Sequence, residues 1–258
     1  MGSKMLFATD FDGTLNSYSA GISEKTVSMI EAFRDAGNYF GVITGRNVNN
    51  IAGITEAIGD HLDFLMCMTG TYAADGAGNI IFEEKGDGGI LADLLMTISD
   101  QKCRYLSYAD GKEAFRIDVS SPLRPDSPDI KEAMRHKSFS QVNTAYNTME
   151  ELEVAMGELL DKFGEKISPQ INGTCLDIPP FGVTKGTAVL RMAKHFGVSE
   201  SRIFTAGDND NDVAMLKMHF GFSVPNGTAG AKAAARKIFP EVGDMLEYVF
   251  KLSQEGSL

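Results

Sequence analysis

The sequence predicts an α/β fold in which a Rossmann-like parallel sheet forms a core domain and a smaller α+β cap domain is inserted into it. Strand and helix patterns alternate at both ends of the chain, and this order is typical of a parallel sheet with helices on its faces. The middle of the chain instead pairs short strands with intervening helices. We therefore expect a discontinuous core at residues 1–83 and 181–258, and a cap, or lid, at residues 84–180.

Three short apolar runs in the first third predict strands, at residues 5–9, 39–43 and 63–68. Two helices are expected between them. Ser23 is a good N-cap for the first helix, which would end near Gly37. The second would run from about residue 47 to 58, with Gly59 as its stop. The core face of the first helix would carry three apolar residues, Val27, Ile30 and Phe33.

The middle of the chain predicts the elements of the cap. A helix from about residue 90 to 99 precedes two short strands around the turn at Asp110 and Gly111. A loop rich in Pro and Ser, residues 120–128, leads to two helical stretches. The second of these, residues 149–163, is strongly amphipathic, with Met149 and Met156 among the residues on its apolar face. A hairpin is expected around Asn172 and Gly173.

The alternating pattern returns after residue 180. Thr184 can cap a helix that ends near His195, with Gly197 beyond it. The strands and helices expected after it are a strand at 203–206, an acidic loop and helix, a strand at 220–224, and helices from about Thr228 and Val242.

Composition narrows the functional classes. The formal net charge of −11 argues against nucleic acid and anionic membranes as partners, because both require a basic surface. No apolar run reaches the 18 or so residues that a membrane-spanning helix needs. The three cysteines, Cys67, Cys103 and Cys175, are odd in number and widely spaced, so we expect no disulfide framework and a cytoplasmic location.

Chemically active side chains follow several of the expected strands. Asp10 and Asp12 follow the first strand, and residues 44–46 (Thr-Gly-Arg) follow the second. The acidic segment 208–212 follows the strand at 203–206, and Lys185 begins the helix after the cap. Ligands of parallel α/β sheets bind outside the carboxyl ends of the strands, so these residues should meet in one crevice.

Such a set suits phosphoryl transfer. A divalent cation must offset the charge of a phosphate monoester while a carboxylate attacks in line. Asp10 can serve as both metal ligand and nucleophile, giving an aspartyl-phosphate. Asp12 can protonate the leaving alcohol and later deprotonate the attacking water. Lys185 and Thr44 can hold the remaining phosphate oxygens. Magnesium, which prefers oxygen ligands and keeps several waters, is the expected cation.

Each motif also has a simpler reading. Asp, Gly and Thr all favour turns, yet Asp-x-Asp-Gly-Thr-Leu fixes five positions and has a chance below roughly one in a thousand in a chain of this length. Thr44-Gly45-Arg46 alone would be a helix-entry turn, and Lys185 alone a solvated helix-start lysine. The segment 207–212 resembles part of a calcium loop but lacks its glycine and terminal glutamate.

Together the motifs resemble those of the haloacid dehalogenase superfamily, in the C2-cap, Cof-like sugar-phosphatase group. The resemblance rests on four motifs in order, on the return segment Leu176 to Gly186, and on Asn226-Gly227. It implies that Asp10 is the nucleophile and Asp12 the general acid and base. The magnesium ligands that it implies are Asp10, the backbone carbonyl of Asp12, and Asp208, with Asp212 in support. The phosphate-binding residues that it implies are Thr44, Gly45, Lys185 and Asn211.

The sequence departs from this group at Thr69, where asparagine is common, and at Asn47, where proline or serine is common. Substrate specificity should reside in the cap, where Arg116, Arg124 and Asn172 are the candidates for substrate contacts. The expected function is hydrolysis of small phosphate monoesters, and the resemblance to the group implies sugar phosphates as the substrates. A sugar phosphomutase and a non-catalytic sugar-phosphate-binding protein are the alternatives.

Overall fold

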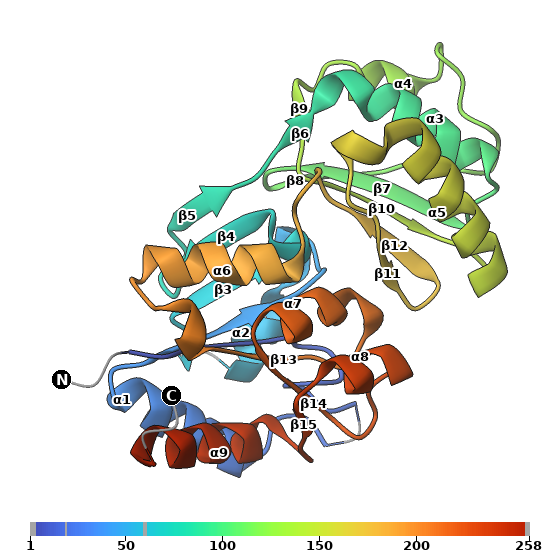
Figure 1. The fold of residues 1–258 in the computed structure, drawn as a ribbon. Helices are drawn as coiled ribbons and strands as arrows, with labels where there is room; N and C mark the ends of the chain where they lie inside the picture. The colour runs from blue at the N-terminus through green and yellow to red at the C-terminus, as the bar shows by residue number, and fades with distance from the viewer. Residues whose placement is uncertain (1–3, 19, 59–60, 256–258) are drawn as a thin grey trace.

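The computed structural model describes residues 4–18, 20–58 and 61–255, and its strands form two main sheets, one above the other in Figure 1. The chain passes from the lower, eight-stranded core sheet to the upper, five-stranded cap sheet and back again. The α/β class predicted from the sequence is confirmed. The exact domain boundaries at residues 83 and 181 stay a prediction.

The core sheet has the order β15-β14-β13-β1-β2-β3-β4-β5. Its strands from β15 to β3 are parallel, and β4 and β5 extend it by antiparallel pairing. In chain order the bounds are β1 Leu6–Thr9, β2 Tyr39–Ile43, β3 Phe64–Cys67, β4 Tyr72–Asp75, β5 Ile80–Glu83, β13 Ile203–Ala206, β14 Phe220–Ser223 and β15 Lys237–Ile238.

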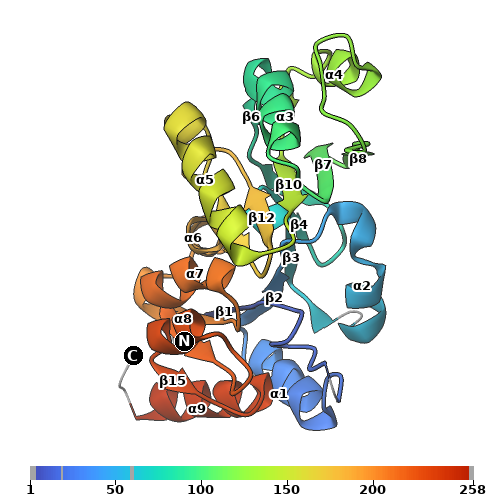
Figure 2. The ribbon, with the colours of Figure 1, turned by 90° about the vertical axis from the view of Figure 1, so that its right-hand side faces the viewer.

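Helices cover both faces of the core sheet, and Figure 2 shows α2 and α6 on opposite sides of it. One face packs against α1 (Glu24–Asp35), α2 (Ala52–Ile58) and α9 (Val242–Gln254). The other packs against α6 (Lys185–His195), α7 (Val213–Met218) and α8 (Ala229–Ala234). Both layers are apolar, so the sheet is buried on both sides, as parallel sheets generally are.

The cap sheet is antiparallel, with the order β11-β12-β10-β7-β8. The bounds are β7 Tyr105–Asp110, β8 Glu113–Arg116, β10 Gln141–Ala145, β11 Gln170–Asn172 and β12 Cys175–Ile178. One face packs against α3 (Leu91–Asp100), α4 (Pro128–Ala133) and α5 (Met149–Phe163) in an apolar cluster of its own. The other face looks toward the core. A small ladder of β6 (Gly86–Asp87) and β9 (Ser138–Phe139) lies beside it.

Most of the expected elements are present, with several corrections. Thr26, Ile30 and Phe33 are the buried residues of α1, and Val27 is only half-buried. On α5, Met149 is 39% exposed, so it does not belong to the core face. The expected helix from residue 47 to 58 is a 3-10 turn, Val48–Asn50, followed by α2. Its predicted stop, Gly59, lies outside the described residues.

Six strands were not anticipated: β4, β5, β6, β9, β10 and β15. Strands β4 and β5 widen the core sheet, and β10 is the centre of the cap sheet. Along the described chain, no helix combines the length and apolarity needed to cross a bilayer.

Candidate active site

The carboxyl ends of β1, β2 and β13 meet below the inner face of the cap sheet. A cavity of about 420 Å³ lies between them, a volume typical of small-molecule sites. Asp10, Asp12 and Asp208 line its core side, and Arg116 and Asn143 are among the residues on its cap side. The convergence expected from the sequence is therefore present in the structure.

Asp10 lies at the end of β1 and is 7% exposed. Its backbone N–H donates to the carbonyl of Ala206 at 2.8 Å, which fixes the residue between β1 and β13. Its Oδ1 accepts a hydrogen bond from Lys185 Nζ at 2.6 Å. Burial raises the pKa of Asp10 to about 8, and the attraction of Lys185 only partly opposes this effect.

Lys185 is the first residue of α6, and its side chain is only 1% exposed. Thr184 caps this helix, and its capping box with Thr187 sets where α6 begins. Lys185 Nζ donates to Asp10 and to Asp212 Oδ1, both at 2.6 Å. Burial alone would lower the pKa of Lys185, but these two carboxylates raise it above its ordinary value. Lys185 is thus a buried cation held by two buried acids.

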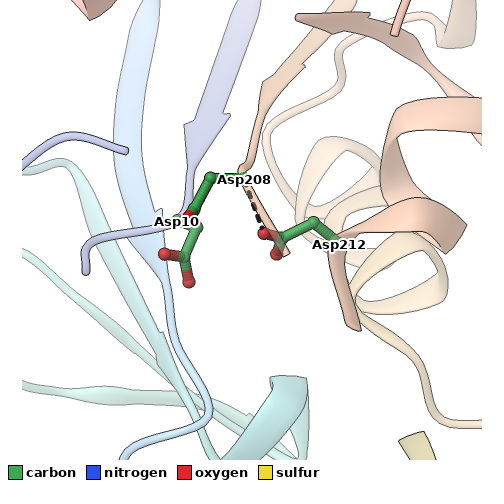
Figure 3. Close-up of side chains that lie close together, drawn as sticks. All are labelled: Asp10, Asp208 and Asp212. Carbon is green, nitrogen blue, oxygen red and sulfur yellow. Dashed lines mark hydrogen bonds between the residues drawn. The ribbon is translucent and has the colours of Figure 1, made fainter. Parts of the chain in front are cut away.

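Asp10, Asp208 and Asp212 each present a carboxylate oxygen within 4.8 Å of the other two, and Figure 3 shows the three side chains close together. Asp212 Oδ2 accepts the backbone N–H of Asp208 at 2.9 Å and that of Asn209 at 3.0 Å. Asp208 Oδ1 accepts from the hydroxyl of Thr14 at 2.8 Å. Burial raises the pKa of Asp208.

This carboxylate group fits a hard divalent cation. Three buried acids face one buried lysine, so a second positive charge would offset the excess negative charge. Oxygen ligands of this kind suit Mg²⁺, Ca²⁺ and Mn²⁺. Gly13 keeps the approach open: its φ is +83°, and a Cβ there would stand 2.5 Å from Asp208 Oδ2.

Asp12 lies outside this carboxylate group, as expected if only its backbone carbonyl binds metal. Its carboxylate accepts two hydrogen bonds from Arg46, and the guanidinium of Arg46 also lies 5.4 Å from the centre of the Phe11 ring. The sequence pattern indicated no role for Arg46 beyond a weak helix-entry motif. Because Asp12 and Arg46 are distant in sequence, only the folded chain reveals their pairing.

The expected phosphate-binding residues lie on the core side of the same crevice. Thr44 is 2% exposed, and its Oγ1 accepts the backbone N–H of Arg46 at 3.2 Å. The carbonyl of Gly45 accepts from Gln141 Nε2 of the cap at 3.3 Å. Asn211 is 5% exposed, and within the described chain its Oδ1 has no hydrogen-bond partner. A buried oxygen left without a donor is the kind of group that a bound ligand or ion satisfies.

The structure brings two of the three cap candidates to the cavity. Arg116 and Asn172 line it. Asn172 accepts a hydrogen bond from Asn209 of the core at 2.8 Å, which joins the cap to the core. Arg124 is absent from the cavity wall, and its exposed guanidinium pairs with Asp100 at 3.1 Å.

Sequence reasoning did not single out Asp177 or Asn143. Asp177 is 4% exposed and accepts hydrogen bonds from Asn143 at 2.7 Å and from Asn172 at 3.3 Å. Burial raises the pKa of Asp177. The sequence did hold a signal, a single acid inside the apolar strand Leu176-Asp177-Ile178.

Two of the known proteins that resemble the chain do so along most of its length, and a third does so over about a third of it. A phosphoglycolate phosphatase of Pyrobaculum neutrophilum is 26% identical over 244 residues, covering 92% of this chain and 90% of that protein. A pyridoxal phosphate phosphatase of Escherichia coli is 23% identical and covers 90% of both chains. A phosphoglycolate phosphatase of Pyrobaculum aerophilum is 37% identical over 86 residues, which span 33% of this chain and 38% of that protein.

Solved structures share the fold. A HAD/COF-like hydrolase of Plasmodium vivax superimposes with a TM-score of 0.79 at 19% identity, covering 97% of both chains. The subclass IIB sugar phosphatase BT4131 superimposes with a TM-score of 0.74 at 19% identity, covering 99% of this chain and all of the other. The profile of the haloacid dehalogenase-like hydrolases matches residues 7–244. With this match and with the ordered motifs around Asp10, the chain belongs to the haloacid dehalogenase-like hydrolase family.

Proposed function

We propose that this enzyme is a magnesium-dependent phosphatase that hydrolyses small phosphate monoesters, sugar phosphates among them, through an aspartyl-phosphate at Asp10. The observation that carries the proposal is the position of the Asp10 carboxylate. Asp10 lines the cavity and accepts a hydrogen bond from Lys185. Its carboxylate belongs to the same group of buried acids as those of Asp208 and Asp212. The phosphatases of P. neutrophilum and E. coli support the same class of reaction.

In the first half-reaction, a carboxylate oxygen of Asp10 attacks phosphorus and the bond between phosphorus and the ester oxygen breaks. Asp12 gives its proton to that leaving oxygen, so the alcohol departs neutral. Arg46 holds the two oxygens of Asp12 in one orientation, and one of its two hydrogen bonds must break for an oxygen of Asp12 to carry the proton that it donates. Lys185, Thr44, Gly45 and Asn211 hold the phosphoryl oxygens.

In the second half-reaction, water attacks the phosphorus of the aspartyl-phosphate and Asp12 takes its proton. The bond between phosphorus and the Asp10 oxygen breaks, which releases inorganic phosphate and restores the carboxylate. The cation, held by Asp10, Asp208 and the Asp12 carbonyl with Asp212 in support, would offset the negative charge of the phosphoryl group.

The cap covers this chemistry from above. Two hydrogen bonds join the cap to the core at the cavity. Asn209 of the core donates to Asn172 of the cap, and Gln141 of the cap donates to the carbonyl of Gly45. A cap held in this way excludes water from the phosphoryl group. It also lets contacts between the cap and the rest of the substrate contribute binding energy to catalysis.

We also place the enzyme in the cytoplasm. Its three cysteines are free, and two of them, Cys67 and Cys103, are buried. Burial raises the pKa of Cys67 to about 12, as in an inert core thiol. Free cysteines are typical of a reducing compartment.

The test is phosphate release from a panel of monoesters, with magnesium and with a chelator. The panel includes p-nitrophenyl phosphate, hexose 6-phosphates, phosphoglycolate and pyridoxal phosphate. We expect turnover only with the metal, no turnover in Asp10→Asn, and a large loss of kcat in Asp12→Asn, with thermal unfolding as the control for folding. Full activity of Asp10→Asn would remove Asp10 as the nucleophile. Isomerisation of a sugar phosphate without phosphate release would identify a mutase.

A further inference from the structure

A row of polar side chains crosses the inner face of the cap sheet. The antiparallel register pairs Asp177 of β12 with Asn143 of β10, and Asn143 with Ser107 of β7. Ser107 in turn pairs with Arg116 of β8. Directly paired residues on neighbouring strands point to the same face of a sheet, and all four line the cavity. We call these four residues the cap row.

The middle of the cap row can both accept and donate hydrogen bonds. Asn143 Nδ2 donates a hydrogen bond to Asp177 at 2.7 Å, which leaves Asn143 Oδ1 as an acceptor. The hydroxyl of Ser107 accepts from the hydroxyl of Tyr105 at 2.9 Å, which leaves the proton of Ser107 for another acceptor. A hydroxyl group of a ligand can donate to Asn143 and accept from Ser107. This part of the cap row therefore suits a ligand with several hydroxyl groups.

Arg116 makes one end of the cap row positively charged. Its guanidinium lies 5.3 Å from the centre of the Tyr105 ring, a stacking contact that restrains its plane. Among the described residues, no acidic side chain lies within ion-pair distance of it. Arg46, the other arginine on the cavity wall, is already held by Asp12. Arg116 therefore presents a planar set of hydrogen-bond donors to the cavity. A guanidinium group binds carboxylates and phosphates through bidentate hydrogen bonds.

The remaining charges of the cavity restrict where an anion can go. Asp12 and Asp208 line the core side, and Asp177 occupies the other end of the cap row. A second negative group on a substrate would be repelled near these carboxylates and attracted only near Arg116. An exposed arginine is often just solvated, but this one is in register with three polar residues and is stacked on an aromatic ring.

We propose that the cap row binds the leaving group of the substrate and selects phosphate monoesters whose leaving group carries hydroxyls and ends in a second anionic group. Asn143 and Ser107 bind the hydroxyls, and Arg116 binds the terminal carboxylate or phosphate. The inference rests on the proposed function, in which the phosphate to be cleaved is at Asp10.

The test compares six-carbon esters that differ in the far end of the leaving group. Hexitol 6-phosphate has a neutral end, 6-phosphogluconate a carboxylate, and hexitol 1,6-bisphosphate a phosphate. We expect the kcat/KM of the wild-type enzyme to be at least about tenfold higher for one of the two anionic esters, as one charge-assisted contact provides. The better of the two identifies the natural terminal group.

Variants assign the effect to the cap row. Arg116→Gln should lower kcat/KM for the preferred anionic ester by roughly tenfold to 100-fold more than for the neutral ester, and Arg116→Lys should recover part of this loss. Ser107→Ala should lower kcat/KM for 6-phosphogluconate more than for 6-phosphooxyhexanoate, which lacks the hydroxyls. Arg135→Gln is the matched control, because Arg135 is a cap arginine paired with Glu132 outside the cavity.

Equal kcat/KM values for neutral and anionic esters in the wild-type enzyme would overturn the inference, as would an equal loss on all esters in Arg116→Gln. Hydrolysis of p-nitrophenyl phosphate reports on the proposed function separately, because this ester has neither hydroxyls nor a second anion. If no ester is hydrolysed, the affinity of magnesium-loaded Asp10→Asn for the same three esters, measured by calorimetry, tests the role of the cap row instead. Tighter binding of an anionic ester would support the cap row, and equal binding would refute it.

Discussion

Arg46 holds the carboxylate of Asp12 by two hydrogen bonds, from Nε to Oδ2 at 2.8 Å and from Nη2 to Oδ1 at 2.5 Å. The two residues follow neighbouring strands, β1 and β2, so the pair ties the ends of these strands together. Both side chains are about one-third exposed, and ion pairs at such positions contribute only about 0–1 kcal/mol to stability. The importance of the pair is therefore in orienting Asp12.

Arg46→Gln should leave the free energy of unfolding within about 1 kcal/mol of wild type but lower kcat by roughly tenfold to 100-fold. Arg46→Lys should recover only part of the activity, because an ammonium group cannot bind both oxygens in one plane. Urea unfolding and initial rates with p-nitrophenyl phosphate provide the two measurements. Arg191→Gln is the control, since Arg191 pairs with Glu84. A kcat of Arg46→Gln within twofold of wild type would contradict the orienting role.

At about pH 9, where Asp10 is ionised, Lys185→Met should destabilise the metal-free enzyme by about 3–5 kcal/mol, because it leaves Asp10 and Asp212 buried without their cation. Magnesium should restore part of this loss by supplying positive charge at the same carboxylates. Urea unfolding with magnesium and with a chelator measures both effects. Lys194→Met removes an exposed lysine of the same helix and should change stability by no more than about 0.5 kcal/mol. Equal stability of Lys185→Met and wild type in chelator would count against this account.

Magnesium binding should release protons at neutral pH. Burial raises the pKa of Asp10 to about 8, so below that pH the metal-free site retains a proton that the cation must displace. Calorimetry in two buffers of different ionisation enthalpy should detect release of up to one proton at pH 6.5, and little above pH 9. The affinity for magnesium should rise with pH and level off above about pH 8. Binding at pH 6.5 without proton release would show that Asp10 is already ionised.

The same pKa shift affects stability in a definite direction. The folded, metal-free enzyme binds the Asp10 proton more tightly than the unfolded chain does, so this stabilising contribution is present in acid and is lost as the pH rises through about 8. Magnesium should therefore raise the thermal midpoint more at pH 8.5 than at pH 5.5. An equal increase at the two pH values would contradict the linkage.

Gly45→Ala should impair cap closure, because a Cβ at this position would stand 2.8 Å from Asp177 Oδ2 of the cap. Overpacking costs about 1–3 kcal/mol, so we expect kcat/KM to fall by roughly tenfold to 100-fold if the closed form bears the cost. Gly157→Ala is the matched control on α5, since no atom lies within 4 Å of the added Cβ. It should stabilise the protein by about 0.5–1 kcal/mol and leave kcat/KM unchanged. Unchanged kcat/KM in Gly45→Ala would refute the packing argument.

The core domain was predictable because its signals are local. Apolar runs ending in polar residues defined β1, β2 and β13, and Ser23 and Thr184 cap α1 and α6 as their side chains predicted. The site followed from the rule that parallel strands present their carboxyl ends at one edge. Asp10, Lys185, Asp208 and Asp212 meet there, although their roles in catalysis stay proposals.

The central cap strand was harder to predict because its inner face is polar. In β10, Asn143 lines the cavity and Gln141 donates to the carbonyl of Gly45 in the core, so the usual contrast between an apolar and a solvated face is weak. The roles of Arg46 and Asp177 depend on partners that come together only on folding. Pairings of this kind leave no periodic signal in the chain.

The cap row belongs to the cap sheet, whereas the carboxylates proposed for catalysis follow strands of the core sheet. Most apolar side chains of the cap form a cluster separate from those of the core. Under the proposed role of the cap row, a substitution at Ser107, Asn143 or Arg116 should therefore change what the cavity accepts without disturbing the packing that positions Asp10. After gene duplication, one copy could acquire a new substrate through a few surface changes in the cap while inheriting its chemistry intact. Divergence within such a lineage should leave the aspartates fixed and the row variable.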